Sequence, residues 1–322
     1  DWLSYIGVAR EVAALTGKKL KIPASRRAGL NPPYGLGKKR GGGHKAESAI
    51  SVKVEDKKLC PRYTARIIRN VKVGESPKWL KEKLEAVGLR SVNNIVDITN
   101  FCLFETGEPM HAFDLDKLTG RSIIVRRASK GEKIKAIDGI ERTLDDDMLV
   151  IADDKSPVAI AGVMGGLYTE VTSQTKNILL EAAYFDPVSA RRTSRRLALS
   201  TDSSYRFERK VDLENIVHAS GRAARLISDL ARGEAGEFID IGEKARALKK
   251  IGLRLDRINK IIGVKISPSR VKSILTSLGL KVRYQSKNLL ELKPPSFRRD
   301  LQNEIDLIEE VARIYGYENI PE

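Results

Sequence analysis

One segment near the start of the chain limits what the rest can fold into. Residues 26–45 contain basic side chains, glycines and prolines but no acidic residue. Such a segment cannot supply a hydrophobic core, so folded structure must lie on either side of it. We expect residues 25–47 to be a linker, which is either a solvated tether or an arm that lies along phosphate groups.

The remainder of the chain has the composition of a folded protein. Apolar residues make up 41% and charged residues 31% of its 322 positions, which is close to the globular average and sufficient for two or three domains. No apolar run approaches the length of a membrane span, so we expect no membrane contact. Cys60 and Cys102 are the only cysteines, which excludes a disulfide framework and makes the cytoplasm the expected compartment.

The balance of charge is strongly basic. Lys and Arg total 58 against 42 Asp and Glu, a formal net charge of +16 at pH 7. Cationic side chains release counterions when they bind a polyanion, which rewards such an excess. The charge therefore indicates either a nucleic acid partner or a basic surface that only confers solubility.

Residues 48–235 mix the patterns of strands and helices. Alternating Ile50, Val52 and Val54 are typical of a half-buried strand. Further strands are expected at 63–73, 123–126, 148–152, 158–163 and 177–182, and helices at 77–87 and 213–231. This mixture predicts an α+β domain with a mixed sheet, followed by a separate module after residues 235–243.

Residues 245–322 predict a smaller second domain. Helix, short connection, helix and hairpin is the outline of a winged helix-turn-helix unit. The expected helices lie at 256–262, 268–278 and 304–314, and the expected strands at 280–284 and 289–292. At the other end of the chain, Ile6, Ala9 and Val12 recur at helical spacing and predict a helix that ends at Gly17.

Among the three histidines, His111 has the surroundings that best suit chemistry. It lies in an expected turn after an asparagine-rich stretch that includes Thr99 and Asn100. Short amide and hydroxyl groups near an imidazole can hold a water or a carbonyl in place. Two interpretations stay open, a catalytic histidine or one whose polar atoms are satisfied within the fold.

Two features after His111 point to a ligand. Gly165 and Gly166 follow an apolar strand, where the backbone must turn tightly or let a ligand approach closely. Glu181 interrupts the apolar run ILLEAAYF, and a carboxylate in a buried strand is costly unless it is paired or bound to a ligand hydroxyl. Glu181 is therefore either a charge at a strand end or a specificity residue.

Basic residues are densest in the run RRTSRR. Part of this cluster can pair with nearby acids such as Asp202 and Glu208, and the rest is a candidate for phosphate contact. The residues concerned are Arg191, Arg192, Arg195 and Arg196.

Acidic residues gather around the start of the last expected helix. Like charges this close repel one another, which suggests either a hard divalent cation such as Mg²⁺ or pairing with Arg298, Arg299 or Arg313. The acidic residues are Asp300, Asp306, Glu309 and Glu310.

Five distinctive segments occur in this order: RSVNNIVDITNFCLFETGEPMHAFD, AIAGVMGG, ILLEAAYFDP, LSTDSSYRFERKVD and PPSFRRDLQNEIDLIEEVARIYGYENIP. Together they resemble the bacterial-type beta subunit of phenylalanine–tRNA ligase. The resemblance covers almost the whole chain apart from residues 25–46. It implies that 48–235 is an editing domain that hydrolyses tRNA(Phe) mischarged with tyrosine, that 245–322 is a helix-turn-helix-like module, and that 1–24 is the helical remnant of another such module.

The resemblance also implies roles for individual residues. Glu181 would bind the para-hydroxyl of tyrosine, while His111 and Asn100 would position the attacking water. A site built to bond a hydroxyl rejects the analogue that lacks it, here phenylalanine. The residues that would line the editing pocket are Arg90, Thr99, Asn100, His111, Glu181, Thr201 and Ser203.

For the second domain, the resemblance implies Mg²⁺ bound by Asp300, Asp306, Glu309 and Glu310 together with the alpha subunit. The implied partners are that subunit, in an α2β2 tetramer, and tRNA(Phe). ATP would be used by the whole enzyme and not bound by this chain alone, which is not expected to activate phenylalanine.

The sequence departs from the family at three positions in or near the implied pocket. Ser203 stands where the family more often has Ala, Ser200 where His is frequent, and Lys210 where Gly is usual. These changes bear on amino-acid selectivity more than on the reaction. Two rival functions stay open, a non-catalytic scaffold that binds nucleic acid and a scaffold for subunit assembly.

Overall fold

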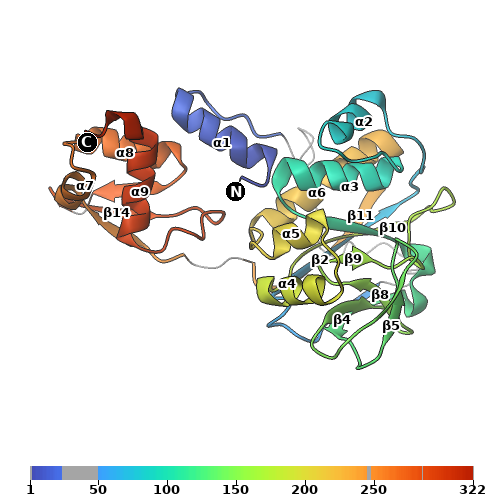
Figure 1. Ribbon diagram of the computed structural model, residues 1–322. Helices are drawn as coiled ribbons and strands as arrows, with labels where there is room; N and C mark the ends of the chain where they lie inside the picture. Colours follow the sequence, from blue (N-terminus) through green and yellow to red (C-terminus); the bar gives the residue numbers. More distant parts are fainter. Residues whose placement is uncertain (1, 24–49, 245–247, 285, 322) are drawn as a thin grey trace, which may run out of the picture. The chain divides into compact units, whose positions relative to one another are not determined.

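The computed structural model describes residues 2–23, 50–244, 248–284 and 286–321 (Figure 1). The chain divides into two compact units, Asp1–Ile22 with Ala245–Glu322 in one and Pro23–Lys244 in the other. The linker predicted at 25–47 lies outside the described residues. No helix in the described ranges is long and apolar enough to cross a membrane.

The larger unit contains two main sheets. The four-stranded sheet is antiparallel throughout, with the order β11-β2-β10-β3. Its strands are β2 (Arg62–Arg69), β3 (Met110–Asp114), β10 (Ile178–Tyr184) and β11 (Glu234–Gly242). Every residue of β10 is buried, because this strand is central and both faces of the sheet are covered.

The five-stranded sheet has the order β1-β4-β7-β8-β9, in which only β1 and β4 are parallel. Its strands are β1 (Ser51–Val54), β4 (Ser122–Arg127), β7 (Leu149–Ala152), β8 (Pro157–Ile160) and β9 (Met164–Gly165). A separate hairpin joins β5 (Lys133–Lys135) to β6 (Glu141–Thr143), and two short 3₁₀ helices cover Leu115–Lys117 and Thr119–Arg121.

Two hydrophobic layers hold this unit together. One lies between the sheets, where Tyr63 and Phe113 pack in a cluster with Ile151 of the five-stranded sheet. The other lies between the opposite face of the four-stranded sheet and three helices, which cover that face in Figure 1. The helices are α2 (Lys78–Glu85), α3 (Asn94–Thr106) and α6 (Asn215–Ala231).

The asparagine-rich stretch forms a helix that the sequence analysis did not predict. Asn93 caps α3, since its side chain accepts hydrogen bonds from the backbone of Ile95 and Val96, and Gly107 ends the helix in the left-handed conformation. The turn predicted at His111 is wrong, because that residue lies in strand β3. Helices α4 (Pro187–Arg196) and α5 (Asp202–Phe207) were also not predicted.

Beyond residue 235, the predicted end of the larger domain, the chain continues in the same sheet. Residues 234–242 form β11, which pairs with β2 in the same sheet, and Arg62 of β2 bonds Asp240 of β11 through two nitrogens at 3.0 and 2.9 Å. Strand β11 lies at an edge of the sheet, and its residues are exposed or of intermediate burial.

The smaller unit confirms the predicted order of helix, helix and hairpin. A three-stranded sheet of order β12-β14-β13 packs against helices around one apolar cluster. The elements are α1 (Tyr5–Thr16), β12 (Ile251–Arg254), α7 (Leu255–Ile262), α8 (Pro268–Ser277), β13 (Lys281–Tyr284), β14 (Leu289–Lys293), α9 (Glu304–Tyr315) and a 3₁₀ turn at Tyr317–Asn319. With the mixed sheets of the larger unit, this confirms the α+β class.

Replacing Lys210 with glycine should stabilise the larger unit. Lys210 is exposed and has a φ of 71°, a conformation that costs a side-chain-bearing residue about 1–2 kcal/mol. Part of that gain is offset by the greater chain entropy of glycine, so we expect about 1 kcal/mol in the free energy of urea unfolding. Lys130→Gly, at an exposed position without a positive φ, should not stabilise the protein. Equal effects of the two substitutions would contradict this reasoning.

Candidate active site

A cavity of about 60 Å³ lies in the larger unit between the two sheets. Its lining includes residues of β3, at the edge of the four-stranded sheet, and of β9, at the edge of the five-stranded sheet. Most of its lining is apolar, including Met110, Phe185 and Phe207. The polar side chains of the lining are those of His111, Glu181 and Ser203. A mostly apolar cavity with a few polar groups is the usual form of a small-ligand site.

His111 and Glu181 lie directly opposite each other on neighbouring strands. The register pairs His111 of β3 with Glu181 of β10, so both side chains point to the same face of the sheet. Residues paired in this way have Cβ atoms about 5 Å apart. His111 Nε2 and Glu181 Oε2 are buried and have no hydrogen-bond partner within the described residues. Two buried polar atoms are thus available to a ligand in the same cavity.

Burial changes the charge of both groups. It raises the pKa of Glu181 to about 8 and lowers the pKa of His111 to about 4, because each charged form loses its hydration. At pH 7 the carboxyl group is therefore mostly protonated and the imidazole is neutral. The cavity can donate and accept hydrogen bonds without carrying a net charge.

The glycines predicted to face a ligand have distinct roles. A Cβ atom added to Gly165 would lie 2.3 Å from Cε1 and 2.7 Å from Nε2 of His111, so the imidazole rests against the bare backbone of β9. A Cβ atom on Gly166 would instead lie 2.6 Å from the carbonyl oxygen of Val158. Gly165 belongs to the cavity lining, whereas Gly166 does not and is required by the packing of the strand.

Helix α5 carries Ser203, which lines the cavity, whereas Thr201, the residue before this helix, is not in the lining. Thr201 caps this helix, accepting a hydrogen bond from the backbone of Ser204 at 3.1 Å. Its hydroxyl also donates to the carbonyl oxygen of Val163 at 2.9 Å, which ties the helix to a residue of the lining. Thr201 is therefore placed to position Ser203, which itself lines the cavity.

The other predicted pocket residues are not in the lining. Thr99 and Asn100 lie on α3, and the Thr99 hydroxyl donates to the carbonyl oxygen of Val96 at 2.7 Å. Arg90 is exposed in the connection between α2 and α3. A substrate that extends beyond the cavity is needed for any of these three residues to contact it.

Two parts of the site were not predicted from the sequence: the aromatic residues of the cavity lining and one buried acidic residue beside it. Phe185 and Phe207 stack edge to face with ring centroids 5.0 Å apart, but an aromatic residue after a strand looks like any core residue. Glu108 directly precedes the lining residue Pro109 and is fully buried, with no partner for either oxygen in the described residues. Burial, and then the charge of Asp212, raises its pKa. The only signal for Glu108 in the sequence was an acidic residue between Gly107 and Pro109.

The arginine cluster lies on α4 and divides into two pairs. Arg192 bonds Asp147 at 3.5 Å, and Arg196 lies 3.1 Å from Asp145 and 2.8 Å from Asp147. Arg191 and Arg195 are exposed and form no ion pair within the described ranges. These two residues are the part of the cluster that is available to an external anion.

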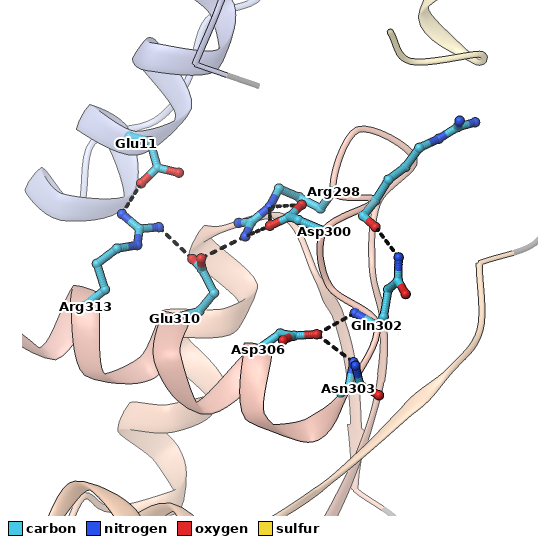
Figure 2. A network of polar contacts seen from close by, with 9 residues as sticks. Glu11, Arg298, Asp300, Gln302, Asn303, Asp306, Glu310 and Arg313 are labelled. Carbon is cyan, nitrogen blue, oxygen red and sulfur yellow. Dashed lines mark hydrogen bonds and ion pairs between the residues drawn. The ribbon is translucent and has the colours of Figure 1, made fainter. Parts of the chain in front are cut away.

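The four carboxylates predicted to bind Mg²⁺ do not form one ligand set, and Figure 2 shows three of them, Asp300, Asp306 and Glu310. Asp300 and Glu310 both bond Arg298, at 2.6 and 2.8 Å. Oδ2 of Asp306 accepts hydrogen bonds from the backbone N–H groups of Gln302 and Asn303, which caps α9. Glu309 is exposed.

These residues do not fit a metal ion as they stand. In the described part of the chain, no three His, Cys, Asp or Glu side chains come together in a group that could hold one. The open alternative of the sequence analysis, relief of repulsion by arginine, holds for Asp300 and Glu310. These four residues therefore do not form a preformed site for the predicted Mg²⁺.

Known proteins share both parts of this architecture. The protein-family model of the B3/4 domain matches residues 59–232, and the protein-family model of the tRNA synthetase B5 domain matches residues 251–317. Phenylalanine–tRNA ligase beta subunits from Moorella thermoacetica, Carboxydothermus hydrogenoformans and Rhodopirellula baltica are 49%, 46% and 47% identical to the whole chain. The chain covers 38%, 39% and 46% of these relatives, less than half of their length.

A solved structure also aligns with this chain. It is an N-terminal fragment of the phenylalanyl-tRNA synthetase beta subunit from Pyrococcus horikoshii, 18% identical, with a TM-score of 0.46. The match covers 98% of this chain and 83% of that fragment.

Proposed function

Because the chain belongs to the family of phenylalanine–tRNA ligase beta subunits, with a B3/4 domain followed by a B5 domain, we propose that its cavity hydrolyses mischarged Tyr-tRNA(Phe). The observation that carries the proposal is the opposed pair of His111 and Glu181, each with an unpartnered buried polar atom in the same apolar cavity of the described larger unit. Hydrolysis of an aminoacyl ester needs a group that orients water and a pocket that selects the amino acid.

Glu181 is suited to the selective step. A phenol hydroxyl is both a donor and an acceptor, and a protonated carboxyl group offers one partner for each role. The tyrosine ring would lie against the apolar lining that includes Phe185 and Phe207. Phenylalanine would leave Glu181 Oε2 without a partner, and an unpaired buried group disfavours the wrong ligand strongly.

His111 is suited to the hydrolytic step. A neutral imidazole can accept a proton from water as its oxygen attacks the ester carbonyl. The new C–O bond forms as the bond to the ribose oxygen breaks, and the proton passes to that oxygen. The products are free tyrosine and uncharged tRNA(Phe), so atoms and charges balance in a hydrolysis that consumes only water.

Deacylation of Tyr-tRNA(Phe) tests this proposal. His111→Ala should slow the reaction about tenfold or more. Glu181→Ala should weaken selection of tyrosine over phenylalanine. His218→Ala is the matched control, because His218 is exposed on α6 and away from the lining. A small tyrosyl ester should be assayed as well, since it does not depend on tRNA affinity. Equal rates in all variants with both substrates would refute the assignment.

The proposal extends to the whole protein of which such a chain forms part. We infer a role in attaching phenylalanine to tRNA(Phe) in the cytoplasm, with the alpha subunit supplying the ATP-dependent step. The subunit-assembly role follows from the family and not from a surface described above.

The arginines of α4 give a test of tRNA binding. Replacing Arg191 and Arg195 with Glu should weaken binding to tRNA and lower its salt dependence by about one unit of slope for each phosphate that is no longer neutralised. The same change at Arg192 and Arg196, which are paired with Asp145 and Asp147, should have a smaller effect. Filter binding at several salt concentrations measures both. Equally tight binding to unrelated duplex DNA would favour the rival function of a non-catalytic scaffold.

A further inference from the structure

Helix α1 is attached to the smaller unit with little apolar burial. Its apolar side chains Tyr5, Val8, Val12 and Leu15 are between 47% and 60% exposed. Only Gly7 is buried within the helix, and Ala14 packs partly against the apolar cluster of the unit. The hydrophobic effect scales with the apolar area removed from water, so it contributes little to this attachment.

Charged groups join α1 to the rest of the unit. Glu11 of α1 bonds Arg313 of α9 at 2.7 Å, with 13% of the Glu11 side chain exposed. The Arg10 guanidinium lies 3.9 Å from the centre of the Phe297 ring, and that of Arg313 lies 5.6 Å from the centre of the Trp2 ring. Glu11 and Arg313 are 302 positions apart in sequence.

The Glu11–Arg313 pair is the end of a longer chain of charges (Figure 2). Arg313 bonds Glu310 at 2.6 Å, Glu310 bonds Arg298 at 2.8 Å, and Arg298 bonds Asp300 at 2.6 Å. Acid and base alternate along its whole length. The middle members, Glu310 and Arg298, have side chains only 10% and 9% exposed. A partly buried chain is screened less by salt than a surface ion pair.

We propose that this chain of charges is an ionic lock that docks α1 onto α9, and that a divalent cation cannot occupy Asp300 and Glu310 while the lock is closed. A cation and a guanidinium compete for the same carboxylate oxygens, and they repel each other. Arg298 would have to leave both acids before an ion could bind. The carboxylates implied to bind Mg²⁺ thus have another role in this chain.

Hydrogen exchange of the full chain tests the lock. Glu11→Gln removes the charge at one end of the chain of charges without altering α9. It should speed exchange of the α1 amides about tenfold or more. Arg257→Ala is the control, because Arg257 pairs with Glu304 at 2.8 Å in the same unit, and neither residue belongs to the chain of charges. It should leave α1 exchange unchanged. Equal exchange in wild type and Glu11→Gln would overturn the proposal.

Addition of MgCl₂ tests the competition. At millimolar concentration, and with NaCl adjusted to equal ionic strength, Mg²⁺ should not raise the melting temperature of the wild-type chain. In Arg298→Ala, where Asp300 and Glu310 are freed, it should raise it. Mg²⁺ that stabilises the wild type while α1 amides stay protected would overturn the competition. Neither readout depends on deacylation, so this proposal can fail while the proposed function stands.

Discussion

Replacing Gly165 with alanine should slow hydrolysis of Tyr-tRNA(Phe) about a hundredfold while the larger unit stays folded. The added methyl group would lie 2.3 Å from Cε1 of His111, a separation that no stable structure tolerates. The imidazole is a side chain and can rotate, so the clash moves the catalytic group rather than the backbone. The same methyl group would fill part of a cavity of only about 60 Å³. Deacylation kinetics and circular dichroism should be measured together.

Gly236→Ala is the matched control for this substitution. Gly236 lies in β11 of the same unit, and its added Cβ atom would lie 3.6 Å from the carbonyl oxygen of Ile67, an ordinary contact. We expect normal deacylation from this variant. If Gly165→Ala hydrolyses Tyr-tRNA(Phe) as fast as Gly236→Ala, then His111 does not act from the position described here.

The sequence located the residues of the pair but not the geometry that unites them. His111 and Glu181 are separated by 70 positions and become neighbours through the register of β3 with β10. Strand pairing between distant segments is not encoded in local periodicity, so no pattern around either residue could reveal it. The resemblance to a family placed both residues in one pocket, and the strand register supplies the physical basis.

Local signals were most reliable where one residue type decides the conformation. Ser267 and Pro268 begin α8, and Gly263 ends α7, as the capping pattern predicts. Helix α3 was not predicted, although Ile95, Ile98 and Cys102 form a buried stripe at helical spacing. The asparagines of this segment were interpreted as groups that could hold a water or a carbonyl. Asn93 in fact caps the helix, and Asn94 bonds the backbone of Gly74 and Lys72.

The acidic cluster shows a different limit of sequence reasoning. Three carboxylates on one helical face suggest a cation, and nearby arginines suggest ion pairs, but spacing alone cannot choose between them. The decision depends on Arg298 reaching both Asp300 and Glu310, and on Glu11 arriving from α1. Tertiary placement, not composition, decides the partner of each charge.

Glu181→Gln should stabilise the larger unit, and the gain should grow as the pH rises. The pKa of Glu181 is about 8 in the folded chain against an ordinary value of 4.5. Between these values the folded state holds one proton more than the unfolded state, so wild-type stability falls with rising pH. The free energy lost by pH 8 is on the order of 5 kcal/mol. Glutamine carries no such proton and avoids the loss.

His111 sets the lower limit of the pH window in which this fall is visible. Its pKa is lowered from 6.5 to about 4, so between those values the unfolded state holds the extra proton and stability rises with pH. Below about pH 6.5 the folded state holds one extra proton on Glu181 and the unfolded state holds one extra proton on His111. The effects of the two groups on stability therefore nearly cancel. The combined contribution of these two groups to wild-type stability is therefore expected to fall between about pH 6.5 and 8.

Urea unfolding at about pH 5, 6.5 and 8 measures this effect for wild type, Glu181→Gln and a control. Glu82→Gln is suitable as the control, because Glu82 lies on the exposed face of α2 in the same unit. The difference between Glu181→Gln and wild type should increase at each step, while that of the control stays constant. A difference that does not change with pH would mean that Glu181 is ionised in the folded chain, and hence that it meets a substrate hydroxyl only as an acceptor.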